Sequence, residues 1–155
     1  MITKAEKERG ERLRAYVQEI RGKPAQWGVD DCSLWVAQWV ANETSREFDW
    51  PDYSSEEEAR RIIDEAGGLV NVWDRVTREA GLMPIHVDKP TIGDVGIIET
   101  SKGHVGGIFT FGGGICVRTL DGAAVLGAVG RSFPVRKGDG TWERRPVVVK
   151  AWALG

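Results

Sequence analysis

The feature that most constrains this chain is a change in its hydrophobic pattern at Met83-Pro84. Before this point, apolar residues recur at three- and four-residue steps, which is typical of amphipathic or buried helices. After Lys89-Pro90 the chain is rich in Gly, Val, Ile and Phe, in short runs separated by turn residues, which is typical of strands. Helices followed by an antiparallel sheet predict an α+β fold, with residues 1–155 as a single domain.

The boundaries of the expected elements follow from caps, breakers and glycine turns. The helical patterns cover 5–20, 32 to about 44, 55–66 and 69–80, with an irregular segment at 45–54. Strand-like runs cover 94–99, 104–111, 115–119, 124–130 and 147–152. Gly112-Gly113-Gly114 predicts a hairpin turn, because glycine adopts the positive φ angles that such turns need.

Composition narrows the classes of function. A net charge of −2 and a pI near 5.8 give no general attraction to nucleic acid or to anionic membrane. The local basic runs 131–137 and 144–145 are interpreted as solvated loops. Two cysteines make no disulfide framework, and no metal-ligand spacing is found, so we expect free thiols and neither metal nor cofactor.

The amino-terminal sequence is polar and carries no secretory signal, and no apolar run is long enough to span a membrane. We therefore expect synthesis in a cytoplasm, without insertion into a membrane. Any action outside a cell then depends on being carried there.

Cys32 stands at the start of the second expected helix, after Asp30-Asp31, either of which is a natural N-cap. In the first turn, free backbone N–H groups and the helix dipole favour the thiolate, so the pattern predicts a lowered thiol pKa. The same N–H groups could stabilise an oxyanion. A cysteine at such a place can also be a small buried hydrophobe.

His104 lies at the start of a strand-like run, Gly103-His104-Val105-Gly106-Gly107, between residues too small to cover it. An imidazole titrates near neutral pH and can take a proton from a thiol. Alone, it is equally compatible with a solvated histidine. The other histidine, His86, is interpreted as structural or solvated, and Cys116 as a packing residue on its strand.

Three motifs together resemble the NlpC-like cysteine peptidases of the papain-like superfamily. They are Asp31-Cys32-Ser33 opening a helix, Ile92-Gly93-Asp94-Val95-Gly96 and Gly103-His104-Val105-Gly106-Gly107-Ile108, and a shortened Trp27-Gly28 loop precedes the cysteine. The resemblance covers roughly residues 27–119. The compact form is similar to members carried by bacteriophage tails and gene-transfer particles.

The resemblance implies a papain-like fold in which Cys32 is the nucleophile and His104 the base, close to each other, acting on an amide of the peptidoglycan peptide stem. Trp27 would line the cleft. Asp31 and Ser33 match positions that can contact the substrate's amino end, although simple helix capping explains both equally well.

One position departs from the family pattern. The family places a third polar residue, often His, Asn or Gln, on the strand after the histidine strand, and the nearest match here is Arg118. A guanidinium has only donors and cannot accept an imidazole N–H. Thr119, a backbone carbonyl or a water would then orient His104. Arg118 is expected at the cleft edge, either binding a substrate carboxylate or exposed and paired with a nearby acid.

These observations leave hypotheses of different classes. The first is a peptidoglycan endopeptidase that docks on hub or baseplate proteins of a phage-like tail and opens the wall during delivery. The second is a catalytically weak or inactive adaptor at a tail tip with the same fold. A third, an amidase or acyltransferase with another acyl substrate, stays open because fold and dyad do not fix the substrate.

Overall fold

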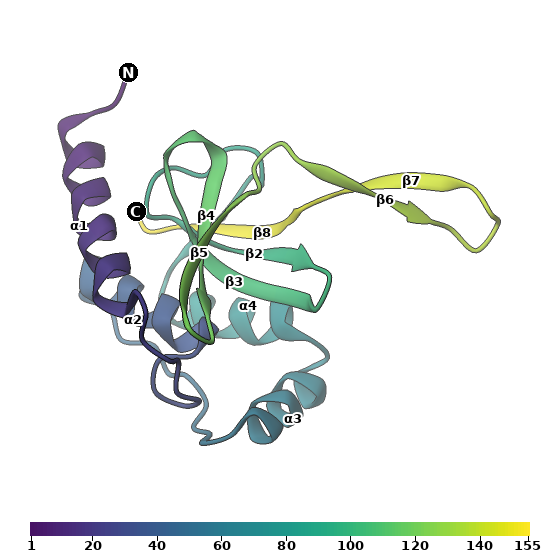
Figure 1. Ribbon diagram of the computed structural model, residues 1–155, viewed down its shortest axis with the longest axis horizontal. Coiled ribbons are helices and arrows are strands. Elements are labelled where there is room, and N and C mark those ends of the chain that lie inside the picture. Colours follow the sequence, from purple (N-terminus) through teal and green to yellow (C-terminus); the bar gives the residue numbers. More distant parts are fainter.

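The computed structural model describes residues 1–155 and shows four helices and two antiparallel sheets (Figure 1). The helices are α1 (Lys4–Ile20), α2 (Cys32–Thr44), α3 (Glu56–Ala66) and α4 (Leu69–Glu79). The strands are β1 (Met83–Ile85), β2 (Val95–Thr100), β3 (Gly103–Phe109), β4 (Gly114–Thr119), β5 (Gly122–Gly127), β6 (Ser132–Arg136), β7 (Trp142–Pro146) and β8 (Val148–Ala153). The predicted α+β class is confirmed.

The larger sheet has six antiparallel strands in the order β1-β8-β2-β3-β4-β5. Its centre is the hairpin β2–β3, in which Val95 pairs with Ile108 and Glu99 with His104. The glycine turn acts as predicted: a short 3₁₀ turn (Phe111–Gly113), with positive φ at Gly112 and Gly113, reverses the chain into β4. Strands β3 and β4 pair only at their inner ends, near Ile108.

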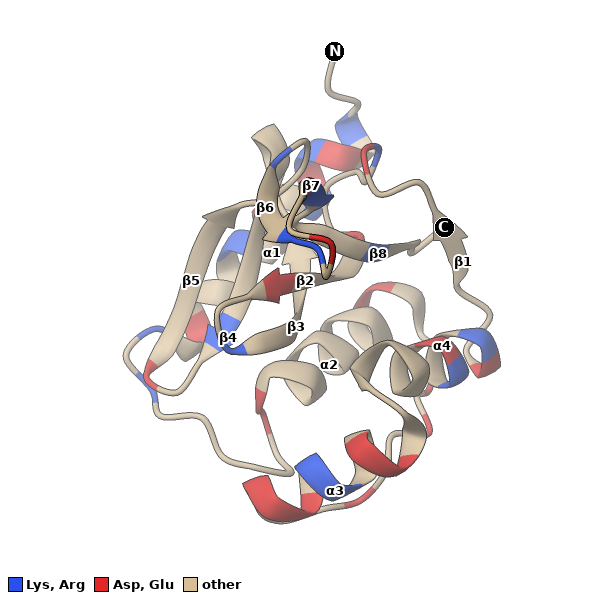
Figure 2. Cartoon of the chain, turned by 90° about the vertical axis from the view of Figure 1, so that its right-hand side faces the viewer, with Lys and Arg blue, Asp and Glu red and all other residues tan.

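One face of this sheet packs on the helices. Its core contains residues of α1, α2 and α4 together with sheet residues, among them Trp35, Trp39, Trp73, Ile97, Ile108, Cys116 and Trp152. Helix α2 is apolar almost all round, as a helix buried between layers must be, and Figure 2 shows it nearly free of charged residues. The opposite face has its own smaller cluster, around Phe109 and Ile115.

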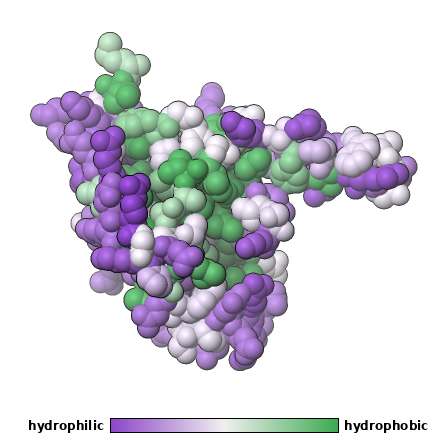
Figure 3. Space-filling model, in the orientation of Figure 1, coloured by the Kyte–Doolittle hydropathy of each residue, from purple (hydrophilic) through white to green (hydrophobic).

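Helix α1 confirms the helical pattern predicted for residues 5–20 and is amphipathic. Leu13 and Ile20 are buried, and Tyr16 stacks on Trp35 of α2 with ring centroids 5.1 Å apart. The Tyr16 hydroxyl also donates to the Trp35 carbonyl. The polar side of α1 forms a hydrophilic margin of the molecule (Figure 3).

The expectation of solvated loops in the basic carboxy-terminal region is wrong for residues 132–146. Strands β6 and β7 pair with each other as a separate two-stranded sheet and project from the rest of the molecule (Figure 1). Arg144 donates to the side chain and carbonyl of Ser132, and Lys137 N–H donates to the Thr141 carbonyl, so cross-strand bonds hold the ribbon. We call residues 131–146 the arm.

None of the helices combines the length with the apolar composition that a membrane-spanning segment needs.

Candidate functional site

Asp31 is the N-cap of α2, which decides between the two aspartates that the sequence offered. Its Oδ1 accepts the N–H groups of Ser33 and Leu34 at 3.2 Å each, and its Oδ2 accepts Gly28 N–H at 2.9 Å and the Tyr53 hydroxyl at 2.7 Å. The carboxylate is buried. Asp31 therefore ties the preceding loop and the Tyr53 segment to the helix start, which supports the capping interpretation of this residue.

Asp30 and Arg118 form the second tie. The Arg118 guanidinium donates from Nη2 to Asp30 Oδ2 at 3.0 Å, from Nε to the Asp30 carbonyl, and from Nη1 to the carbonyls of Lys23 and Gly122. Its side chain is 0% exposed. Hydrogen bonds from Gln26 and Arg118 outweigh desolvation and lower the pKa of Asp30.

Arg118 lines the cleft, but its guanidinium donors are bound to protein acceptors and none is left for a substrate carboxylate. Its donors join strand β4 to the loop that precedes α2, and none of its side chain reaches solvent. The alternative is an exposed arginine paired with a nearby acid. Arg118 is paired with an acid, Asp30, but its side chain is buried, so only the exposed placement is wrong. Arg118 therefore has a structural role: it holds the loop before α2 in place against strand β4.

Cys32 is the first residue of α2, and it is partly buried at the N-terminus of that helix. Burial, and after it the negative charge of Asp31, raises the pKa of the Cys32 thiol to about 11, although contacts with Ser33 oppose this shift. The prediction of a lowered thiol pKa is thus wrong, because burial of the sulfur and the neighbouring anion of the N-cap Asp31 outweigh the contacts at the helix start that favour a thiolate. The resting sulfur is a neutral thiol at pH 7.

His104 extends from β3 opposite Glu99 of β2, with which it is in register. Its Nε2 lies 2.6 Å from Glu99 Oε2. The ring makes no hydrogen bond to Cys32 or to Thr119, and Nδ1 is not used. The partner of the imidazole is therefore a carboxylate on the preceding strand, which the sequence analysis missed when it proposed Thr119 or the backbone.

A cleft of about 700 Å³ contains both Cys32 and His104 in its lining. It opens where β3 and β4 diverge beyond Ile108, and Tyr53 and α3 border its other side. All the residues proposed from the sequence line this cleft, namely Trp27, Asp31, Cys32, Ser33, His104, Arg118 and Thr119. The topology thus brings together residues that lie up to 92 positions apart in the chain.

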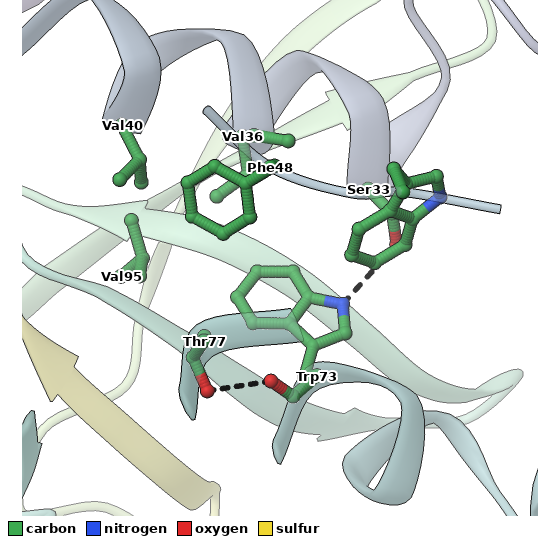
Figure 4. A pocket seen from close by; sticks show the side chains of 9 residues that line it. Ser33, Val36, Val40, Phe48, Trp73, Thr77 and Val95 are labelled. Carbon is green, nitrogen blue, oxygen red and sulfur yellow. Dashed lines mark hydrogen bonds between the residues drawn. The ribbon is translucent and has the colours of Figure 1, made fainter. Parts of the chain in front are cut away.

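Ser33 faces inward from the cleft. Trp73 of α4 donates its indole N–H to Ser33 Oγ at 3.3 Å, beside a small internal cavity lined by Phe48 and Val36 (Figure 4). Trp73 in turn occupies the space that Gly106 leaves open, since a Cβ there would lie 2.3 Å from the indole. Ser33 and Gly106 thus hold α2 and α4 against the sheet behind the thiol.

Four further charged groups line the cleft, namely Glu56, Arg60, Lys102 and Asp121. Arg60 pairs with Glu56 on α3, while Lys102, in the β2–β3 turn, makes only a backbone contact, from its N–H to Thr100 Oγ1. No three His, Cys, Asp or Glu side chains are grouped so that they could hold a metal ion. The arrangement offers a nucleophile, a base paired with an acid, and one free cation.

Comparison with known proteins gives a family match. Residues 6–135 match a family described as "Domain of unknown function (DUF6950)", a span that contains every residue of the cleft and ends within β6 of the arm. No curated protein matches the sequence.

Proposed function

The chain belongs to the DUF6950 family, and from the geometry of its cleft we propose that it is a cysteine endopeptidase that cuts the peptide stem of peptidoglycan. The observation that carries the proposal is that Cys32, at a helix start, and His104, held by Glu99 on the sheet, line one cleft of about 700 Å³. A thiol and an imidazole that line one substrate-sized cleft are the groups that cysteine-dependent amide hydrolysis uses.

The proposed reaction starts from the neutral thiol. As Cys32 Sγ attacks the amide carbonyl carbon, its proton passes to the unused Nδ1 of His104. Asp31 occupies the N–H groups of Ser33 and Leu34, so the N–H of Cys32 itself is the donor for the oxyanion. His104 then gives the proton to the leaving nitrogen as the C–N bond breaks, leaving a thioester on Cys32.

Water completes the cycle. His104 takes a proton from the attacking water, the C–S bond breaks, and the proton passes to the departing sulfur. This step restores the Cys32 thiol and releases the carboxylic acid product.

The layers fit the papain-like arrangement of the proposal, since the helix carrying the thiol packs against the strand carrying the histidine. The substrate class rests on the resemblance of the motifs around Cys32 and His104.

The test is digestion of purified peptidoglycan, with released fragments identified by mass spectrometry. The unchanged protein and Cys116→Ala, the control for the other thiol, release stem-peptide fragments, and Cys32→Ala and His104→Ala release none. If the unchanged protein releases no fragment from walls of several stem and cross-link types, the endopeptidase proposal is wrong.

The proposed setting is a phage-like tail, where the arm docks on a hub or baseplate protein. An isolated two-stranded hairpin is marginally stable in water, and this one exposes Trp142 by 64% with Arg136 over its ring. Aromatic and arginine side chains are enriched in protein interfaces. Quantitative proteomics of purified particles tests this: the chain is present, and Trp142→Ala lowers its amount, whereas its absence from particles removes the tail setting alone.

A second candidate, a binding adaptor without turnover, is favoured by one observation. The Cys32 thiol has a pKa raised to about 11 by burial and by Asp31, and no hydrogen bond joins it to His104. If the protein is an adaptor, it binds peptidoglycan fragments, and Cys32→Ala and His104→Ala release the same amount of product as the unchanged protein. Comparing binding and cleavage in the same preparations separates the two candidates.

A further inference from the structure

The β2–β3 turn places an acid and a histidine in a fixed relation. Two residues, Ser101 and Lys102, separate Thr100 from its partner Gly103, whose φ of +105° closes the turn. This register puts Glu99 opposite His104 on the same face of the hairpin, and their side chains meet at 2.6 Å. The pair is therefore a product of strand register.

The atoms in contact decide which imidazole nitrogen is free. Glu99 Oε2 lies 2.6 Å from His104 Nε2, a separation at which a carboxylate oxygen and an unprotonated ring nitrogen would repel each other, so the neutral ring carries its proton on Nε2 and presents a bare Nδ1. A base must offer an unprotonated nitrogen to the thiol. We propose that Glu99 is the positioning residue of His104, fixing its tautomer and its orientation in the cleft. The kinetic part of this inference rests on the proposed endopeptidase function, but the tautomer does not.

The neighbouring charges leave this role to Glu99. In the cleft lining, Arg60 is bound to Glu56, and the charges of Asp31 and Arg118 are committed to the contacts described above. Lys102 and Asp121 are the remaining charged groups there. On the helix-facing side of the sheet, Lys150 is paired with Asp74 of α4. None of these groups contacts the His104 ring.

The alternative is that Glu99 and His104 form an exposed ion pair with no further role. Removing such a pair has almost no effect on the protein. The side chains of His104 and Glu99 are 37% and 35% exposed, so this alternative must be tested directly. The arm offers a matched control: Glu143 is 38% exposed and paired with Arg145 on the same strand, far along the chain from the cleft.

The primary test is the ¹⁵N spectrum of the imidazole rings at a pH where both histidines are neutral. The chain has two histidines, so assignment needs one variant, and His86 serves as an internal reference. In the unchanged protein His104 is the Nε2–H tautomer. Glu99→Gln keeps this tautomer because its side-chain oxygen still accepts, Glu99→Ala gives a tautomer mixture, and Glu143→Ala changes nothing. A dominant Nδ1–H form in the unchanged protein, or the same spectrum in Glu99→Ala, would overturn the inference.

The second test is peptidoglycan hydrolysis by the same variants. Glu99→Ala lowers kcat about tenfold to a hundredfold, the size of effect known for residues that orient metal-bound histidines, and leaves KM within about twofold. Glu99→Gln restores most of the loss, and Glu143→Ala matches the unchanged protein. Equal kcat in all four proteins overturns the positioning role. If no protein cleaves, the endopeptidase proposal fails while the tautomer result still decides the placement of the proton.

Discussion

The two walls of the cleft use charge in opposite ways. The loop wall, residues 23–33 with Arg118, buries two charged groups: Asp31 accepts four hydrogen bonds, and the Arg118 side chain is wholly buried against Asp30. The turn wall, residues 99–104, leaves its charged groups half-exposed in the ion pair of Glu99 and His104 and exposed in the free cation Lys102.

The difference separates support from chemistry. Buried charges whose donors and acceptors are all used can stabilise a shape but have nothing left for a ligand, and losing one partner strands the other. Half-exposed groups with few partners contribute little to stability and stay free to act. We therefore expect changes in the loop wall to alter the free energy of unfolding, and changes in the turn wall to alter reactivity alone.

Arg118→Gln gives the largest expected loss. It removes the partner of Asp30 and leaves the carbonyls of Lys23 and Gly122 unbonded, so the free energy of unfolding falls by about 3–5 kcal/mol, as for other broken buried pairs. Urea denaturation measures this, with Arg145→Gln on the exposed arm as control. A loss below about 0.5 kcal/mol, the range of surface changes, would show that the loop wall is not a frame.

Asp31→Ala is the next largest. It removes the N-cap of α2 and leaves the Gly28 N–H and the Tyr53 hydroxyl without their acceptor, for about 2–4 kcal/mol of lost stability. Ser55→Ala, which removes a cap with a single bond from α3, should cost about 1 kcal/mol. Equal losses in the two variants would reduce Asp31 to an ordinary cap.

Alkaline pH tests the burial of the thiol in the loop wall. The folded-state pKa of Cys32 is about 11, above the roughly 8.5 of an unfolded thiol. Both states are protonated below the lower value, and between the two the unfolded chain loses its proton first, so stability falls as pH rises through this window. The loss reaches about 1–3 kcal/mol.

Urea titrations at pH 7.5 and 10.5 isolate this effect as the difference between the unchanged protein and Cys32→Ala. The comparison is necessary because burial also raises the pKa of the Cys116 thiol to about 11 and raises the pKa of Tyr16 and Tyr53. Cys116 and Tyr16 titrate alike in both proteins and cancel, and the charge of Cys32 is only the smallest of the causes that raise the pKa of Tyr53. The same pH dependence with and without Cys32 would contradict the assignment of a buried, neutral thiol.

The sequence predicted the α+β class because hydrophobic periodicity and glycine punctuation are local signals. It missed β6 and β7, whose residues 132–146 lack a strong apolar alternation and are held by side-chain bonds such as that from Arg144 to Ser132. A charged ribbon with little core contact carries little hydrophobic pattern, so its run of arginines was interpreted as loop.

The site was predictable in its members and less so in its electrostatics. The order of motifs selected Cys32 and His104, which line one cleft. The sign of the Cys32 pKa shift depends on burial beside Asp31, which the sequence does not specify. Glu99 could have been found, because a two-residue turn at Ser101-Lys102 pairs positions 99 and 104 by simple counting. The burial of Arg118 follows from tertiary contacts alone.

Lys102 gives the smallest expected effect on stability and the sharpest contrast with Arg118. Its ammonium, free at the mouth of the cleft, should attract anions to Cys32 by long-range electrostatics, which salt screens. The measurement is the alkylation rate of Cys32 by iodoacetate relative to neutral iodoacetamide. Lys102→Gln should lower this ratio about two- to fivefold at low salt and by a smaller factor at high salt. The free energy of unfolding should stay unchanged within about 0.5 kcal/mol.

Arg131→Gln, which removes the same charge from the arm, should leave the ratio unchanged. An unaltered ratio in Lys102→Gln would mean that the turn wall offers no field to a ligand, and the contrast between the walls would then rest on burial alone.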